Sequence, residues 1–302
     1  MEKIKQNSPM SNFSIVSDEK TILGESPIWD ELSQRIYWVD IEGKTLHAWS
    51  YLDNKKLSWN FVSRPCAISL TNKVNILLCA FDKYFAYFNI ENQKIEKLKN
   101  QIELPNNVRF NDGKTDGYGR FWCGTMSEAD PIVKEACIYM LDQNFTLKNV
   151  FKNIYISNSL TTIKGNKGMY FSDSYTKKIY KALFSKNSNE VLQDVKVFRN
   201  NHKFKGAPDG STTDIEGNLW NAEWNGSRIV KYDSKSNILE EIIVPLKRPT
   251  SCTFGGPNMD LLFITSAVTD NKQDNLLNGN VIYFKTNTKG VFSNRFIVNN
   301  SI

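Results

Sequence analysis

The chain has 302 residues, of which 40% are hydrophobic and 23% are charged, so it can bury a sizeable core. Its apolar stretches are short and broken by charged residues, whereas a membrane-spanning helix needs about 20 apolar residues in a row. The 38 basic and 32 acidic residues leave a net charge of +6, spread along the chain without a basic block. We therefore expect neither a membrane nor a nucleic-acid partner.

The N-terminus and the cysteines indicate the cellular compartment. Residues 1–12 lack the apolar region and the cleavage site of a secretory signal, so we expect a flexible tail there and a single domain over residues 13–302. The five cysteines are odd in number and include no C-x-x-C pair. This pattern predicts a cytoplasmic protein without disulfides and without a thiolate metal cluster.

Histidine is scarce, and this excludes several kinds of active site. His47 and His202 are the two histidines of the chain. They cannot supply an H-E-x-x-H metalloprotease, a three-histidine zinc site or a two-histidine iron site. His47 falls in an alternating strand and His202 in a charged loop, so both are expected at the surface. No serine lies in a G-x-S-x-G motif, which argues against a hydrolase with that nucleophile.

In chain order, six similar units follow one another, and each contains a strand, a turn and a second apolar strand. Aligning the units on a central apolar residue gives spacings of 40, 44, 49, 49 and 43 residues, the length of one four-stranded blade. Third strands are expected at residues 44–50, 178–184 and 228–233, which alternate between apolar and polar. We predict an all-β, six-bladed β-propeller, whose closed ring leaves only short protected edges. The aligned residues are Trp38, Leu78, Trp122, Phe171, Trp220 and Phe263.

The first strand of each unit is expected to start near the axis of the ring, so the six head positions should converge. Two carboxylates and two carboxamides would then face one small volume. Like charges in a partly desolvated channel repel unless a cation or a shared proton compensates them. With oxygen donors and no imidazole pair, a hard divalent cation such as calcium, magnesium or manganese is expected in the channel. The head residues are Glu25, Cys66, Asn111, Asn158, Asp209 and Ser251.

Five sequence motifs carry a resemblance to a known family. As a set, and in this order, they resemble the regucalcin (senescence marker protein), gluconolactonase and luciferin-regenerating enzyme family over nearly the whole chain. They are 24–29 (GESPIW), 109–114 (RFNDGK), 119–126 (GRFWCGTM), 208–210 (PDG) with 217–220 (GNLW), and 254–256 (FGG).

The resemblance implies a propeller that hydrolyses a small sugar lactone with one divalent metal ion in its central channel. It implies that the cation activates the lactone carbonyl as a Lewis acid and that an aspartate assists the attack of water. Calcium is the favoured ion, with magnesium, manganese, zinc and iron as alternatives. The implied metal ligands are Glu25, Asn158 and Asp209, with Asp209 also the acid and base, and the implied substrate-binding residues are Arg109, Asn111 and Glu128.

One motif departs from the family pattern, and two other functions stay open. The family usually has Asn-Gly where this chain has Asn158-Ser159, so we expect the loss of a positive φ that glycine adopts at low cost. The alternatives are a non-catalytic, calcium-binding regulatory propeller and a metal-dependent hydrolase of another ester or of organophosphates. Because a closed ring needs no partner to cover its edges, a monomer is expected.

Overall fold

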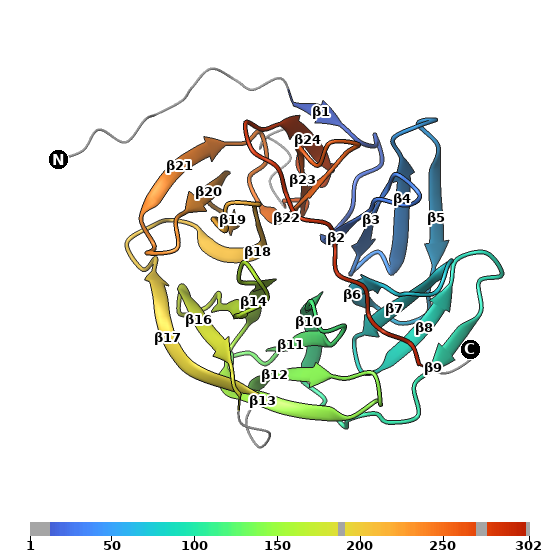
Figure 1. Cartoon of the computed structure of the whole chain (residues 1–302), viewed down its shortest axis with the longest axis horizontal. Helices are drawn as coiled ribbons and strands as arrows, with labels where there is room; N and C mark the ends of the chain where they lie inside the picture. The colour runs from blue at the N-terminus through green and yellow to red at the C-terminus, as the bar shows by residue number, and fades with distance from the viewer. Residues whose placement is uncertain (1–12, 187–190, 270–276, 300–302) are drawn as a thin grey trace.

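The computed structural model describes residues 13–186, 191–269 and 277–299. Within them the chain forms six four-stranded antiparallel sheets, arranged as blades around a central channel (Figure 1). The predicted six-bladed β-propeller is therefore confirmed. None of the described segments forms a helix that could span a bilayer. The predicted tail over residues 1–12 lies outside the described residues.

The first three blades follow one another along the chain, and each runs outward from its innermost strand. Blade 1 contains β2 (Gly24–Asp30), β3 (Arg35–Asp40), β4 (Thr45–Ser50) and β5 (Lys56–Asn60). Blade 2 contains β6 (Pro65–Leu70), β7 (Ile76–Phe81), β8 (Phe85–Asn89) and β9 (Ile95–Lys97). Blade 3 contains β10 (Val108–Thr115), β11 (Phe121–Ser127), β12 (Ala136–Leu141) and β13 (Leu147–Ile154).

The next two blades repeat this order, and the last one takes its outer strand from the beginning of the chain. Blade 4 contains β14 (Ser157–Thr162), β15 (Gly168–Asp173), β16 (Lys178–Phe184) and β17 (Leu192–Asn200). Blade 5 contains β18 (Ala207–Thr213), β19 (Leu219–Trp224), β20 (Arg228–Tyr232) and β21 (Ile238–Ile243). Blade 6 contains β22 (Pro249–Gly255), β23 (Leu261–Ser266), β24 (Ile282–Lys285) and β1 (Ser14–Ile15).

Blade 6 closes the ring by pairing the two ends of the chain. Ser14 pairs with Tyr283 in the register of β1 and β24. On the inner side of the same blade, the Thr250 hydroxyl donates to the Gly24 carbonyl at the start of blade 1. Strand β1 thus completes blade 6, and the Thr250 hydrogen bond joins this blade to blade 1, so the ring is closed without the open edges of a linear array.

The core lies between the blades, and the second strands contribute many of its large side chains. The six residues on which the sequence units were aligned all lie in these second strands and are nearly inaccessible to solvent. Trp122 and Trp220 are among the largest fully buried side chains. Blade 1 packs on blade 6 through Trp29 and Phe263, whose rings stack 5.6 Å apart. The expected core role of these aromatic residues is confirmed, and the five cysteines are unpaired as predicted.

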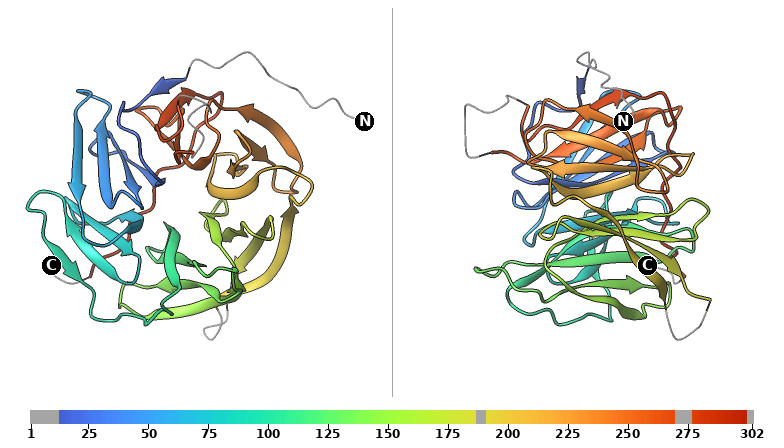
Figure 2. Two further views of the ribbon diagram at one scale, coloured as in Figure 1. Left: turned by 180° about the vertical axis from the view of Figure 1, so that it is seen from behind. Right: turned by 90° about the vertical axis from the view of Figure 1, so that its left-hand side faces the viewer.

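A C-terminal segment beyond β24, residues 290–298, crosses the ends of the innermost strands. It bridges Asp214 at the end of β18 through Gly290 and Thr71 at the end of β6 through Phe296. Between them, Asn294 donates to the Thr115 carbonyl at the end of β10. The segment lies in front of the ring in Figure 1 and behind it in the left view of Figure 2. It therefore ties blades 2, 3 and 5 together at the end of the channel away from the strand starts.

The packing of this segment leads to a prediction about stability. Phe296 is fully buried in the core cluster of blades 1 to 3, so Phe296→Ala should lower the free energy of unfolding by about 3–5 kcal/mol. Urea denaturation of both proteins measures the difference. Phe292, 63% exposed on the same segment, is the matched control, and Phe292→Ala should change stability by less than about 0.5 kcal/mol. Equal effects of the two substitutions would contradict the role given to this segment.

Candidate functional site

Each innermost strand starts with a β-bulge, and the head residues lie at these bulges. The register between first and second strand shifts in all six blades, for example between Glu25 and Ile28 and between Asn158 and Thr161. A bulge bends the strand and redirects a side chain. Here it turns the heads of blades 1, 3, 4 and 5 into one cavity of about 280 Å³. The predicted convergence of Glu25, Asn111, Asn158 and Asp209 is therefore confirmed.

The other two head residues lie behind the cavity wall. The Cys66 sulfur is 3.9 Å from Arg109 Nη1, and the Ser251 hydroxyl lies against Gly210, where a Cβ atom would meet it at 2.0 Å. Gly210 follows Asp209 directly, so this close approach of blades 5 and 6 requires glycine. Blades 2 and 6 therefore support the site without lining it.

The serine that replaces the family glycine keeps the left-handed backbone. Ser159 has a φ of 60°, so the expected loss of a positive φ is wrong. The reason lies in its hydroxyl, which donates to the Asp209 carbonyl at 2.5 Å and accepts from Asn221 Nδ2 at 3.1 Å. These bonds offset the steric cost of a side chain at this φ. Ser159 thus links the bulge of Asn158 to the bulge of Asp209.

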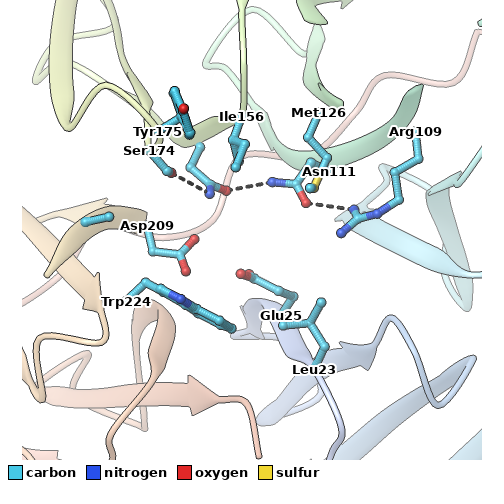
Figure 3. Close-up of a pocket in the computed structure, with 12 residues that line it drawn as sticks. Leu23, Glu25, Arg109, Asn111, Met126, Ile156, Ser174, Tyr175, Asp209 and Trp224 are labelled. Carbon is cyan, nitrogen blue, oxygen red and sulfur yellow. Dashed lines mark hydrogen bonds between the residues drawn. The ribbon is translucent and has the colours of Figure 1, made fainter. Parts of the chain in front are cut away.

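A chain of hydrogen bonds fixes the two carboxamides (Figure 3). Arg109 Nη1 donates to Asn111 Oδ1 at 2.7 Å, and Asn111 Nδ2 donates to Asn158 Oδ1 at 2.9 Å. Asn158 Nδ2 in turn donates to the Ser174 hydroxyl at 2.9 Å. These partners set the orientation of the Asn158 amide. Its oxygen has a second lone pair beyond the one that accepts from Asn111.

Two carboxylates face each other across the cavity, Glu25 from blade 1 and Asp209 from blade 5 (Figure 3). Both are buried, at 7% and 5% exposure. Burial raises the pKa of Glu25 to about 8, with a further contribution from the charge of Asp112. Burial also raises the pKa of Asp209 well above its usual range, and the charges of Glu25 and Asp112 add to this shift. The two acids therefore cannot both ionise at low cost unless a positive charge compensates them.

The oxygen atoms in the cavity are suitable ligands for a hard divalent cation. Asp209 Oδ1 is buried and has no hydrogen-bond partner, and it lies in the same cavity as the Glu25 carboxylate and the Asn158 amide. Carboxylate and amide oxygens are the ligands that calcium and magnesium prefer. Across the part of the chain that the structure describes, no three His, Cys, Asp or Glu side chains converge to hold a metal. A cation at this site would therefore depend on the amide oxygen as well as the two acids.

The remaining predicted residues form the wall beside Asn111. Arg109 is buried, and its Nε donates to Glu128 Oε1 at 3.2 Å. Glu128 does not line the cavity. Instead it accepts two hydrogen bonds from Arg64, at 2.8 and 2.9 Å. The structure thus brings Arg109 to the cavity and places Glu128 behind it as a partner of two arginines.

The sequence patterns missed the apolar lining of the cavity and the Ser174 hydroxyl. Met126 pairs with Arg109, and Trp224 pairs with Ala207, in the first hairpins of blades 3 and 5. In each first hairpin, the second strand ends beside the start of the first strand, where the head residue lies. The last residues of the aligned units could therefore have indicated that Met126 and Trp224 line the cavity. The lining residues not predicted are Leu23, Met126, Ile156, Ser174, Tyr175, Ala207 and Trp224.

Comparisons with known proteins agree with the resemblance seen in the motifs. Residues 23–268 match the family described as SMP-30/Gluconolactonase/LRE-like region. A provisionally named sugar lactone lactonase of Bacillus subtilis is 33% identical over 252 residues, 83% of this chain and 85% of that protein. An L-arabinolactonase of Azospirillum brasilense is 29% identical over 300 residues, 97% of this chain and 98% of that protein. A solved structure of a calcium-binding regucalcin from Agrobacterium tumefaciens has a TM-score of 0.87 at 25% identity, covering 93% of this chain and 96% of that one.

The buried acids predict how stability depends on pH in the chelator-treated protein. Folded Glu25 keeps its proton up to about pH 8, whereas the unfolded chain releases it near pH 4.5. The folded state therefore binds more protons between these values, and stability falls as the pH rises. From pH 5 to 8, the free energy of unfolding should drop by at least about 1 kcal/mol more in the wild type than in Glu25→Gln. Urea titrations of both proteins across this range measure the difference, and parallel curves would contradict the shifted pKa.

The unusual serine gives a second prediction. Ser159→Ala keeps a side chain at a positive φ but removes the hydroxyl, so it should cost roughly 1–2 kcal/mol of stability. Ser159→Gly also loses the hydroxyl but relieves the backbone, so it should cost less. Urea denaturation ranks the three proteins. A glycine variant less stable than the alanine variant would show that the backbone at this position is not strained.

Proposed function

Because the chain belongs to the SMP-30/gluconolactonase/LRE-like family, we propose that it hydrolyses a small sugar lactone with the help of one divalent cation. The observation that carries this proposal is the unpartnered Asp209 Oδ1, buried in one cavity with Glu25 and Asn158. These three residues would hold the cation, which is proposed to be calcium. When bound, the cation supplies Lewis-acid polarisation of the lactone carbonyl.

The protein's own groups would handle the proton. Hydrolysis forms a bond between the water oxygen and the carbonyl carbon and breaks the bond between that carbon and the ring oxygen. Asp209 would accept a proton from the attacking water through one carboxylate oxygen. It would then donate this proton to the ring oxygen, which is the leaving group. Its position supports this role, because Asp209 lines the cavity in which the substrate would bind.

Arg109 would orient the substrate. Its Nη1 is held by Asn111 and by the Phe110 carbonyl, and its Nε is held by Glu128. The guanidinium plane is therefore fixed before the substrate arrives, and Arg109 lines the cavity in which the substrate would bind. A preoriented arginine binds the oxygens of a substrate with little loss of side-chain entropy. Asn111 would act through this arrangement, because it connects Arg109 to the ligand Asn158.

Two further properties are part of the proposal. The unpaired state of all five cysteines supports a reducing, cytoplasmic location. The closed ring, in which β1 completes blade 6, supports a monomer. A purely calcium-binding role would use the same three oxygen ligands, but it gives no reason for a fixed arginine in the same cavity.

The proposal predicts metal-dependent turnover. Treatment with a chelator should abolish hydrolysis of aldonolactones in a pH-stat assay, and a divalent cation should restore it. Asp209→Asn should lower kcat by at least about a thousandfold, because it removes both a ligand and the base. Arg109→Ala should chiefly raise KM, because it removes substrate contacts rather than chemistry.

A matched control separates these effects from a general loss of charge. Asp194 is exposed on β17, the outermost strand of blade 4, and Asp194→Asn should leave kcat and KM unchanged. Calcium binding by calorimetry, with no turnover of any lactone, would favour the regulatory alternative. Full activity of the folded Asp209→Asn variant would exclude the proposed mechanism.

A further inference from the structure

The cavity has two chemically different parts (Figure 3). One is the polar floor of Glu25, Arg109, Asn111, Asn158 and Asp209. The other is an apolar collar, a name used here for apolar side chains that lie beside the floor residues around the same cavity. The collar consists of Leu23, Met126, Ile156, Ala207 and Trp224.

The collar is built on paired backbone segments rather than on long loops. Leu23 forms a bridge with Ala267 of blade 6, and Met126 forms a bridge with Ile156. Trp224 pairs with Ala207 in the first hairpin of blade 5. Sites on paired strands are held more precisely than sites on loops. The collar is therefore a fixed wall of the cavity.

Trp224 is held from behind by an arginine. The Arg248 guanidinium lies 5.1 Å from the centre of the Trp224 ring, within the range of a cation–π contact. Arg248 itself donates to Asn225 Oδ1 at 3.2 Å and to the Val268 carbonyl at 3.1 Å. With one side of the ring occupied, the indole presents its remaining surface to the cavity that it lines.

Three of the five floor residues, Arg109, Asn111 and Asn158, are hydrogen-bonded in a chain, and the other two are the acids assigned to the cation. Both amide hydrogens of Asn111 are used, one by the Ser157 carbonyl and one by Asn158 Oδ1. The hydroxyl of Ser174, beside the floor, donates to the Pro208 carbonyl at 2.6 Å. Few donors and acceptors other than those of Arg109, Tyr175 and the Trp224 indole are thus left for a substrate that carries a hydroxyl on every carbon.

We propose that the substrate presents a deoxygenated edge, a methyl or methylene group, to the collar, and that deoxy lactones are preferred over fully hydroxylated aldonolactones. This inference rests on the proposed lactonase function. A hydroxyl pressed against the collar would lose its bonds to water without gaining a partner, which costs roughly tenfold in affinity. A methyl group there loses nothing and buries apolar surface. A cavity of about 280 Å³ suits one such ring with a short substituent.

Two substrate pairs that differ by one hydroxyl test the preference. D-Galactonolactone is compared with its deoxy analogue D-fuconolactone, and L-mannonolactone with L-rhamnonolactone, using the cation-loaded protein. In at least one pair, kcat/KM of the deoxy member should be about tenfold higher or more. Equal values within both pairs, or higher values for the hydroxylated members, would overturn the inference.

Variants of the collar assign the preference to its residues. The ratio in question is kcat/KM of the deoxy lactone divided by kcat/KM of its hydroxylated partner. Ile156→Asn should reduce this ratio to less than about threefold, mainly by lowering KM for the hydroxylated lactone, because an amide then meets the extra hydroxyl. Met126→Gln, which is close in shape to the original residue, should act in the same direction if the asparagine variant does not fold. Ile243→Asn is the matched control, because Ile243 is 68% exposed on β21, and it should leave the ratio unchanged. A ratio unaffected by either collar variant would overturn the inference.

A binding measurement separates this inference from the proposed function. The ring lactams of the same sugars resist hydrolysis, so their dissociation constants can be measured by calorimetry whether or not the protein is a lactonase. About tenfold tighter binding of the deoxy lactam supports the collar even if no lactone is hydrolysed, in which case only the lactonase proposal fails. Equal dissociation constants, or no binding of either lactam, would overturn the inference.

Discussion

The constraint on which this molecule depends is the repulsion between two buried carboxylates, Glu25 and Asp209, that the ring holds in one cavity. They belong to blades 1 and 5. Burial raises the pKa of both carboxyl groups, and the charge of Glu25 raises the pKa of Asp209 further. Blade 6 lies between these two blades and is itself closed by β1. The closed ring therefore prevents the repulsion from being relieved by separation, and a proton or a cation must relieve it instead.

Hydrogen bonds between neighbouring blades, beside the channel, hold the head residues in place. The Ser26 hydroxyl accepts from the Ile68 amide, and Asp112 accepts from the Leu160 amide. Ser159 continues the series by donating to the Asp209 carbonyl. Each of these residues lies next to a head residue, so the position of a head is set by the neighbouring blade as well as by its own. The geometry of the site is thus a property of the whole ring rather than of one loop.

Features that arise within one blade could be predicted from the sequence, whereas contacts between blades could not. Strand alternation and the 40 to 49 residue spacing arise within single blades, so they predicted the six blades and the convergence of Glu25, Asn111, Asn158 and Asp209. The closing strand β1 contains only Ser14 and Ile15, and the C-terminal segment has no periodic pattern; both are set by contacts with distant residues. Glu128 follows its motif as expected, but Arg64 from blade 2 holds it behind Arg109. Pairings between blades leave no mark in a repeat alignment.

Apart from Ala207, which shares β18 with Asp209, the apolar collar comes from residues outside the innermost strands that supply the polar floor. The floor comes from bulges in innermost strands, where a change would disturb the bonds between blades. Met126 and Trp224 come instead from the ends of the second strands β11 and β19, and Leu23 and Ile156 precede β2 and β14. Their side chains contribute surface to the cavity but no hydrogen bond to the floor. A propeller of this construction can therefore change the surface that it offers to a ligand at the collar while the carboxylates and the carboxamides remain as they are.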